Sequence, residues 1–388
     1  MSSAHPSVVY LDHAATSPIR PEAREAMLAA LDIGANASAV HAKGRSARAV
    51  IETARSDVAR LVGAEPSQVV FTSGGAEANT LAVEGLAASG AKTLIVSAIE
   101  HPSVSEAAKA TGVLVEVWPV TAEGVVDLDW LSARLEAWDE ATDRRLAVGL
   151  MLANNETGAI QPVAEVSRLV RARNGLLHID AVQAVGKIAV DLEALGADTL
   201  TLSAHKIGGP QGSGALVFGP RAVIRRRIHG GGHEQGLRAG TENLSGVAGF
   251  GAAAKVSLAH LPQMAQLALW RDAAAQKAKA AGAVVAAEAA PRLPTILNIA
   301  VPEFPSQTQL MLLDLEGVMV SAGSACSSGK ATASGVLTAM GYGDLAKGAL
   351  RVSSGWSTTE ADWDRFTTVW LAAYARHAAR HKPLGEVA

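Results

Sequence analysis

The segment Thr-Leu-Thr-Leu-Ser-Ala-His-Lys-Ile-Gly-Gly-Pro, residues 199–210, is a short strand-like run that leads into a lysine and two glycines. Its lysine, Lys206, is predicted to reach from the strand's end into a polar cavity walled by glycine. Burial disfavours the ammonium form and lowers the pKa of a lysine, so a desolvated Lys206 would be a neutral nucleophile toward an aldehyde near physiological pH. The segment therefore indicates a Schiff-base lysine.

An acidic residue upstream gives Lys206 a chemical partner. Residues 176–179 form an apolar strand-like run that ends in Asp180. Pyridoxal phosphate requires a lysine for its aldehyde and a carboxylate beside its pyridine nitrogen. Considered singly, a lysine near glycines is usually a solvated turn residue, and an acid after a strand is usually a helix cap. Because another strand-like run follows at 212–218, the two residues together favour a site for this cofactor.

The composition is that of a globular protein. The chain has 388 residues, 49% of them hydrophobic, with a formal net charge of −3, so neither disorder nor a nucleic-acid-binding surface is indicated. This length fits two domains. The first residues do not resemble a signal peptide and no apolar run reaches the roughly 18 residues of a membrane span. We expect a cytoplasmic enzyme, and the single cysteine, Cys326, fits a reducing compartment.

Short strand-like runs alternate with alanine-rich helical stretches through the first two thirds of the chain. This alternation predicts an α/β fold with a mainly parallel sheet covered by helices. The predicted strands are residues 69–71, 93–96, 113–117, 147–152, 176–179, 200–202 and 215–218. Ligands of such sheets bind at the carboxyl ends of the strands, where Asp180, His101 and the glycines after Phe71 are expected to meet.

The last third of the chain predicts a smaller α+β domain. Residues 245–284 are expected to form an inter-domain helix, and residues 289–294 a connector. Strands at 296–299 and 317–320 and further helices would follow. The final helix has an apolar stripe that we interpret as packing rather than as a ligand site, formed by Trp363, Phe366, Val369, Trp370 and Tyr374.

Several polar residues follow the predicted strands. Residues 71–81 read as a strand, a glycine turn and a helix, which would point backbone N–H groups at a phosphate. His101 could stack on a pyridine ring and transfer protons, or could simply cap the next helix. Asn155 could donate to a substrate carboxylate or to the cofactor. Ser203 and His205 could add donors to the phosphate.

Cys326 lies among small residues, 321–330, with no large apolar side chain to bury it. We interpret it as an exposed nucleophilic thiolate, although a free cysteine is more often a small buried hydrophobe. The run His229-Gly-Gly-Gly-His233-Glu234 suggests a metal site at first sight. Because no further ligand set accompanies it, we expect no metal.

Seven collinear motifs resemble those of the cysteine desulfurases, pyridoxal-phosphate enzymes of the class V aminotransferase group with the type I fold. The resemblance runs nearly end to end. The motifs are residues 10–16, 100–101, 154–158, 180–187, 203–210, 229–241 and 323–326. It implies a large domain with a seven-stranded mixed sheet, residues 16–260, and a small domain, residues 1–15 and 261–388, which carries Cys326.

The resemblance also implies a role for each matching residue. Lys206 would form the Schiff base, His101 would stack on the ring, and Cys326 would accept sulfur. The implied cofactor ligands are Gly75, Asp180, Gln183, Ser203, His205, Lys206, Asn155 and, toward the neighbouring subunit of a homodimer, Thr241. The implied substrate ligands are Asn36, Asn155 and Arg351. Where the family commonly has threonine this chain has Ala76, so one hydroxyl contact to the phosphate would be absent.

The implied activity converts L-cysteine to L-alanine and leaves a persulfide on Cys326. An acceptor protein, such as an iron–sulfur scaffold, would then take the sulfur. Two alternatives remain. A selenocysteine lyase or another class V aminotransferase-like enzyme would share Lys206 and Asp180 without needing Cys326, and a non-catalytic dimeric scaffold partner would keep the fold alone.

Overall fold

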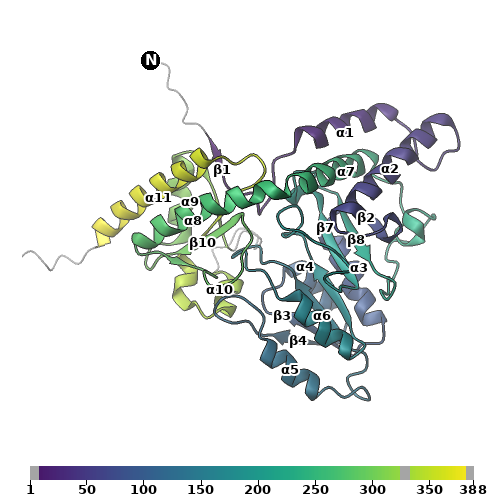
Figure 1. Ribbon diagram of the computed structural model, residues 1–388, viewed down its shortest axis with the longest axis horizontal. Helices are drawn as coiled ribbons and strands as arrows, with labels where there is room; N and C mark the ends of the chain where they lie inside the picture. Colours follow the sequence, from purple (N-terminus) through teal and green to yellow (C-terminus); the bar gives the residue numbers. More distant parts are fainter. Residues whose placement is uncertain (1–7, 324–332, 382–388) are drawn as a thin grey trace, which may run out of the picture.

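The larger of the two main sheets has seven strands. The computed structural model describes residues 8–323 and 333–381, and Figure 1 shows this sheet in the lower right half of the molecule. The strand order is β2-β8-β7-β6-β5-β3-β4. The strands are β2 (Val69–Thr72), β3 (Thr93–Ser97), β4 (Leu114–Trp118), β5 (Ala147–Met151), β6 (Leu176–Asp180), β7 (Thr199–Ser203) and β8 (Gly214–Phe218). Each predicted strand of this region is confirmed to within a residue or two at its ends.

Strand β8 is antiparallel to both of its neighbours, and the other neighbouring pairs are parallel. A parallel connection needs a crossover of a dozen or more residues, usually a helix. Residues 204–213, which join β7 to β8, are too few for one, so the chain turns back on itself. Lys206 lies in this tight connection, at the carboxyl end of β7.

Helices cover both faces of the large sheet. Alternate residues of a strand point to opposite faces, and in β3 Ile95 packs into one apolar cluster while Leu94 and Val96 pack into another. The first cluster contains residues of α2 (Ala42–Leu61), α5 (Leu128–Glu136), α6 (Val163–Ala172) and α7 (Leu244–Ala259). The second contains residues of α3 (Gly75–Ala88) and α4 (Pro102–Ala110). Helix α1 (Pro21–Ile33) packs on α7.

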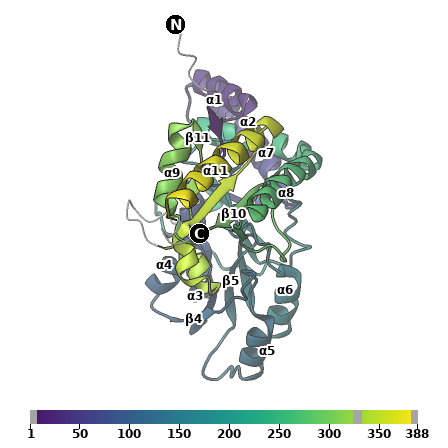
Figure 2. The ribbon, with the colours of Figure 1, turned by 90° about the vertical axis from the view of Figure 1, so that its left-hand side faces the viewer.

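The smaller sheet is antiparallel, with strand order β12-β13-β10-β9. Its strands are β9 (Val284–Val285), β10 (Ile296–Ala300), β12 (Ser321–Ala322) and β13 (Ala349–Ser353). In Figure 2, α11 (Glu360–His381) lies between α8 (Met264–Ala280) and α9 (Ser306–Leu315). The short helix α10 (Gly335–Ala339) precedes β13. A separate two-stranded pair joins β1 (Val9–Tyr10) to β11 (Val318–Met319), which brings the N-terminal segment to this half of the molecule.

The apolar stripe of α11 forms much of the second core, as predicted. Trp363, Phe366, Val369 and Trp370 are buried there, and Tyr374 packs against them. The indole N–H of Trp370 donates to Gln309 Oε1 of α9 at 2.9 Å. This stripe therefore fixes α11 against α9 and the small sheet rather than binding a ligand.

Two predictions for the last third need correction. The single helix expected at 245–284 is two helices, α7 and α8, bent by 56° around the turn Leu261–Gln263, where Pro262 cannot donate a helical hydrogen bond. The expected connector, 289–294, lies between β9 and β10, which pair with each other, so it is inside the small sheet. The strand expected at 317–320 is present as the shorter β11, and β12 follows it in a different sheet.

In the ranges 8–323 and 333–381, no single helix is both long and apolar enough to cross a membrane. Helices α7 and α8 meet those criteria only when taken together across their bend.

Candidate active site

A cavity of about 560 Å³ lies at the carboxyl ends of the large-sheet strands, at the edge predicted from the sequence. Its walls come from the turn after β2, from the segments after β3, β5, β6 and β7, and from β13 of the small sheet. The predicted site residues that line it are Gly75, His101, Asn155, Asp180, Gln183, Ser203, His205, Lys206 and Arg351. The cavity therefore collects residues from both halves of the fold.

Lys206 enters the cavity from the 3₁₀ turn Ala204–Lys206 that follows β7. Its Nζ donates to the carbonyl oxygens of Ala14 at 2.6 Å and Ala15 at 2.8 Å. Gly208, two residues later, has φ +81°, and a Cβ there would come within 2.6 Å of the Arg20 side chain. Glycine is thus required both for the backbone conformation and for the close approach that turns Lys206 inward.

Asp180 is held in one orientation at the end of β6. It is 6% exposed, its Oδ1 accepts from the backbone N–H of Val182 at 3.0 Å, and its Oδ2 accepts from Asn79 Nδ2 at 2.8 Å. Asn79 in turn contacts Nε2 of His178 at 3.0 Å. Burial lowers the pKa of His178 to about 4, so this histidine is a neutral hydrogen-bonding partner.

His101 caps the next helix, as one of its two interpretations predicted, and it also lines the cavity. It is the N-cap of α4, because its Nδ1 accepts from the backbone N–H of Ser103 at 3.1 Å, and its ring also lines the cavity. Burial and the nearby Lys206 lower the pKa of His101, although Asp180 acts in the opposite direction. A neutral ring that accepts at Nδ1 carries its proton on Nε2.

The opposite end of the cavity is formed by Ser73, Gly74 and Gly75 at the start of α3. A Cβ on Gly214 of β8 would lie 2.5 Å from the Gly74 carbonyl carbon, so only glycine allows β8 to pass this close to the turn. Ser203 and His205 contribute side chains to the same cavity. The helix N-terminus, the hydroxyl and the imidazole together can hold an anionic group.

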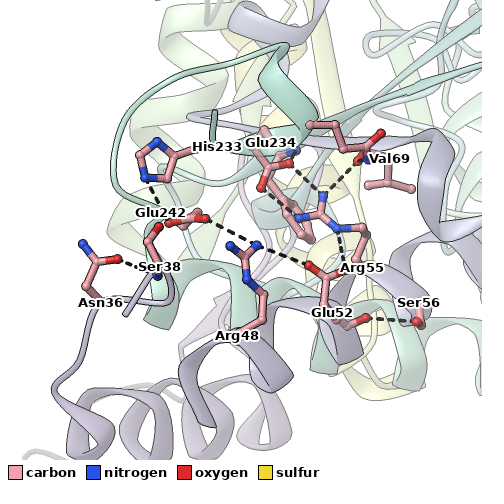
Figure 3. Close-up of polar contacts among 12 residues, drawn as sticks. Asn36, Ser38, Arg48, Glu52, Arg55, Ser56, Val69, His233, Glu234 and Glu242 are labelled. Atoms are coloured by element: carbon pink, nitrogen blue, oxygen red, sulfur yellow. Dashed lines mark hydrogen bonds and ion pairs between the residues drawn. The ribbon is translucent and has the colours of Figure 1, made fainter. Parts of the chain in front are cut away.

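The strand before this turn is fixed by a buried ion pair, shown in Figure 3. Glu234 binds Arg55 through two hydrogen bonds of 2.7 and 3.0 Å, and its Oε2 also accepts from the backbone N–H of Phe71 at 2.8 Å. Arg55 donates to the Val69 carbonyl at 2.9 Å. The segment around Glu234 is thereby tied to both ends of β2, which leads into the glycine turn.

Arg351 is the cavity's contribution from the small sheet. It lies in β13 and is 2% exposed, with Nη2 donating to Asp12 at 3.0 Å and Nη1 to the Asn155 carbonyl at 3.1 Å. Its Nε is buried without a hydrogen-bond partner among the described residues. A guanidinium in this position can bind a carboxylate through two parallel hydrogen bonds.

Comparison with known proteins adds to this geometry. The family model described as "Aminotransferase class-V" matches residues 9–366. The chain belongs to the class-V aminotransferase family.

The relatives of this family member include curated cysteine desulfurases. The chain is 38% identical to "Cysteine desulfurase IscS" of Dictyoglomus turgidum, over 91% of this chain and 91% of that protein. It is 37% identical to the "IscS-like cysteine desulfurase" of Mycobacterium tuberculosis, over 95% and 97%. The solved NifS-like protein of Rickettsia africae superposes with a TM-score of 0.87 at 32% identity, covering 95% of this chain and 99% of that one. The expected type I fold is confirmed.

Enzymes of this family depend on pyridoxal phosphate, and the cavity of this chain has groups that fit the cofactor. Lys206 can bind an aldehyde and Asp180 can pair with a protonated ring nitrogen. The turn at Gly75 can hold a phosphate, and a Cβ at that position would approach the Val182 side chain to 3.2 Å. The cofactor predicted from Lys206 and Asp180 is therefore supported by the donor set.

Three predicted residues lie outside this cavity or outside the described residues. Asn36 is exposed, its Oδ1 accepts from the backbone N–H of Ser38 at 2.8 Å, and it does not line the cavity. Thr241 is also exposed and absent from the lining. Cys326 belongs to the segment 324–332, which is not described.

Sequence reasoning missed the residues that support the predicted ones. Asn79 orients Asp180, and the carbonyl groups of Ala14 and Ala15 receive Lys206. Asn79 lies in a helix that was interpreted only as the source of a phosphate-binding N-terminus. Backbone carbonyls leave no trace in residue identity, so nothing in the sequence could have indicated the two alanines.

Proposed function

We propose that this chain is a cysteine desulfurase that binds pyridoxal phosphate in the 560 Å³ cavity and transfers the sulfur of L-cysteine to Cys326. The observation that carries the proposal is the meeting of Lys206, Asp180 and Arg351 in one cavity. These residues are an amine, a carboxylate and a guanidinium drawn from two different sheets. The relatives that cover nearly the whole chain are themselves cysteine desulfurases.

The cofactor, when bound, supplies an aldehyde that captures amines and a ring that stores electrons. Lys206 would hold that aldehyde and, as a free amine, would take the proton from the substrate Cα. Asp180 would keep a proton on the ring nitrogen, and the Gln183 amide would donate to the phenolic oxygen. His101 would lie against the ring, while Ser203, His205 and the amide of Gly75 would hold the phosphate.

Arg351 and Asn155 bind the substrate carboxylate and so place its thiol. The Cys326 thiolate attacks the substrate sulfur, forming a sulfur–sulfur bond while the carbon–sulfur bond breaks and its electron pair remains with carbon. Protonation of that carbon completes L-alanine, and Cys326 retains the persulfide. The overall exchange converts L-cysteine and a thiol into L-alanine and a persulfide, with no external oxidant or reductant.

Assembly and location are parts of the same proposal. Thr241 and Asn36 are exposed outside this chain's cavity, which fits residues that serve a second subunit of a homodimer. We propose a large domain of residues 16–260 and a small domain of residues 1–15 and 261–388; the second core, which contains Val9, Leu11 and three alanines of α8, supports this division. A reducing compartment such as the cytoplasm keeps Cys326 as a thiol, and a sulfur-acceptor protein would receive its persulfide.

The test measures alanine and persulfide formed from L-cysteine by the wild type, Lys206→Ala and Cys326→Ala, with Lys255→Ala as the matched control for an exposed lysine. Both active-site variants should lose sulfur release, and only Lys206→Ala should lose the visible absorption band of the bound cofactor. Lys255→Ala should match the wild type. Full sulfur release by Cys326→Ala would indicate a lyase, and a wild type that binds no added cofactor would indicate a non-catalytic partner.

A further inference from the structure

Lys187 is a buried lysine that contacts Gln183, one of the residues that line the cavity. It is 7% exposed and lies in the turn region that follows Asp180, the last residue of β6. Its Nζ donates to the Gln183 carbonyl at 2.8 Å and to Gln183 Oε1 at 3.0 Å. Lys187 therefore holds both the backbone and the side chain of Gln183, a residue that lines the cavity.

This contact decides which way the Gln183 amide faces. A lysine ammonium has donors and no acceptor, so the oxygen of the amide must be the atom directed at Lys187. The NH₂ group consequently lies on the other side, where Nε2 donates to the Ala14 carbonyl at 2.9 Å. The same carbonyl accepts from Lys206 Nζ at 2.6 Å. An amide NH₂ has two hydrogens, so the second can serve an acceptor in the cavity.

The positive charges around Lys187 favour an anionic acceptor for the second hydrogen of the Gln183 amide. A small cavity of about 20 Å³, close to the room that one water needs, is lined by His13, Arg20, Lys187 and Lys206. Within the described part of the chain its lining includes no aspartate or glutamate. Burial, Lys206 and Arg351 together lower the pKa of Lys187 to about 7. The charged form of Lys187 is thus disfavoured by these cations, and a nearby anion would stabilise it.

The positive charge of Lys187 also reaches two nearby histidines. Burial, Lys206 and then Lys187 lower the pKa of His205 to about 4. Burial, Lys187 and then Arg20 lower the pKa of His13 to about 3. Both histidines are therefore neutral near pH 7, so the positive charge close to Lys187 comes from Lys206, Arg20 and Arg351.

We propose that Lys187 is a positioning residue of the cofactor site, which holds the Gln183 amide with its NH₂ toward the cavity and favours an anionic oxygen at that position. The phenolic oxygen of pyridoxal phosphate has this chemistry. The inference rests on the proposed function, because it assigns Lys187 to the same cofactor.

The test uses the full-length protein, stripped of cofactor and titrated with pyridoxal phosphate, as wild type, Lys187→Met, Gln183→Met and the double variant. Affinity is measured together with the pH at which the visible band of the bound cofactor changes. Lys187→Met should bind about tenfold more weakly, the loss expected for one hydrogen bond to a charged group. Its absorbance titration should move up by about one pH unit, because removing a neighbouring positive charge favours protonation.

The double variant distinguishes positioning from a general structural effect. If Lys187 acts through Gln183, Lys187→Met should change affinity less than about twofold in the Gln183→Met background. Multiplied losses in the double variant, or a wild-type affinity and titration in Lys187→Met, overturn the inference. If Lys187→Met does not fold, Lys187→Gln, which keeps a donor without charge, should retain affinity but still move the titration upward. A Lys187→Gln protein with the wild-type titration overturns the inference as well.

The two proposals fail in different ways. A wild type that binds no pyridoxal phosphate overturns both. If the wild type binds the cofactor and releases sulfur, and Lys187→Met has the wild-type affinity and titration, only the role of Lys187 is overturned.

Discussion

At the scale of single residues, hydrogen bonds and burial set the state of the acids near the cavity. Asp180 accepts hydrogen bonds on both oxygens, from Val182 and Asn79. Glu100, next to His101, is buried. Burial raises the pKa of Glu100 to about 8, although hydrogen bonds from Ser97 and Met151 oppose the shift. Glu100 is therefore mostly protonated at neutral pH.

Asp180→Asn should lower the rate of alanine formation by at least about 100-fold, the loss typical when one preorganised electrostatic partner is removed. Asparagine keeps the size of the side chain and its contact with Asn79, but it cannot hold a proton on a ring nitrogen. The measurement is kcat with saturating L-cysteine, together with the affinity for pyridoxal phosphate. A variant with kcat within threefold of the wild type would remove Asp180 from its proposed role.

Glu100→Gln should change how stability depends on pH. The folded pKa of Glu100 is raised to about 8 from an ordinary value of 4.5. Its contribution is therefore complete below pH 4.5 and is lost as the pH rises to 8. A glutamine does not titrate, so the variant should gain on the order of 5 kcal/mol relative to the wild type between those limits, at about 1.4 kcal/mol per pH unit. Urea unfolding of both proteins across this pH range measures the difference in their free energies of unfolding. A difference that does not change with pH would contradict the expectation.

At the scale of elements, buried polar contacts join segments that lie far apart in the chain. The Arg55–Glu234 pair connects α2 to the segment before α7 and to β2 between them. Glu100 connects β3 to β5, because its Oε1 accepts from Ser97 Oγ at 2.5 Å and from the Met151 N–H at 2.8 Å. These contacts hold the strand ends at the register that the cavity requires.

Arg55→Met and Glu234→Gln should each destabilise the fold by about 3–5 kcal/mol, because each leaves a buried charge without its partner. The double variant should lose less than the sum of the two, since no unpaired charge remains. Denaturant unfolding of the three variants forms the double-mutant cycle (Figure 3). Arg365→Met is a matched control, because Arg365 and its partner Glu316 are 39% and 49% exposed and the change should alter stability by less than about 1 kcal/mol. Additive losses at Arg55 and Glu234 would contradict the coupling.

At the scale of the whole molecule, the cavity is complete only when the small sheet lies against the large one. Arg351 comes from β13, and its partners Asp12 and Asn155 come from the N-terminal segment and from the turn after β5. The bend between α7 and α8 lets consecutive helices pack on two different cores. Substrate recognition is therefore expected to depend on Arg351, and cofactor binding mainly on the large sheet.

Arg351→Lys should raise KM for L-cysteine about 10- to 100-fold, because an ammonium cannot replace the two parallel hydrogen bonds of a guanidinium to a carboxylate. The visible band of the bound cofactor should remain as in the wild type. Steady-state kinetics and absorbance spectra measure the two effects. An unchanged KM, or loss of the cofactor band, would contradict the division between the two sheets.

The sequence by itself determined the strand pattern of the large sheet and the edge at which its polar residues meet. Lys206, Asp180 and His101 could be found because strand periodicity and parallel connections bring the carboxyl ends of strands together. The motif resemblance added Arg351 and Gln183, which periodicity alone would not single out. The sequence pattern was sufficient to predict features, such as strand periodicity, that depend on residues near one another in the chain.

Tertiary structure alone decided the contacts that orient these residues. The carbonyls that receive Lys206, the amide of Asn79 on Asp180 and the ammonium of Lys187 on Gln183 depend on distances set by packing. The break between α7 and α8 was likewise missed, because the apolar pattern continues through Leu261, Met264 and Leu267 while the two helices pack on different cores. Residue identity specifies donors and acceptors, but only the packed fold brings each donor to its acceptor.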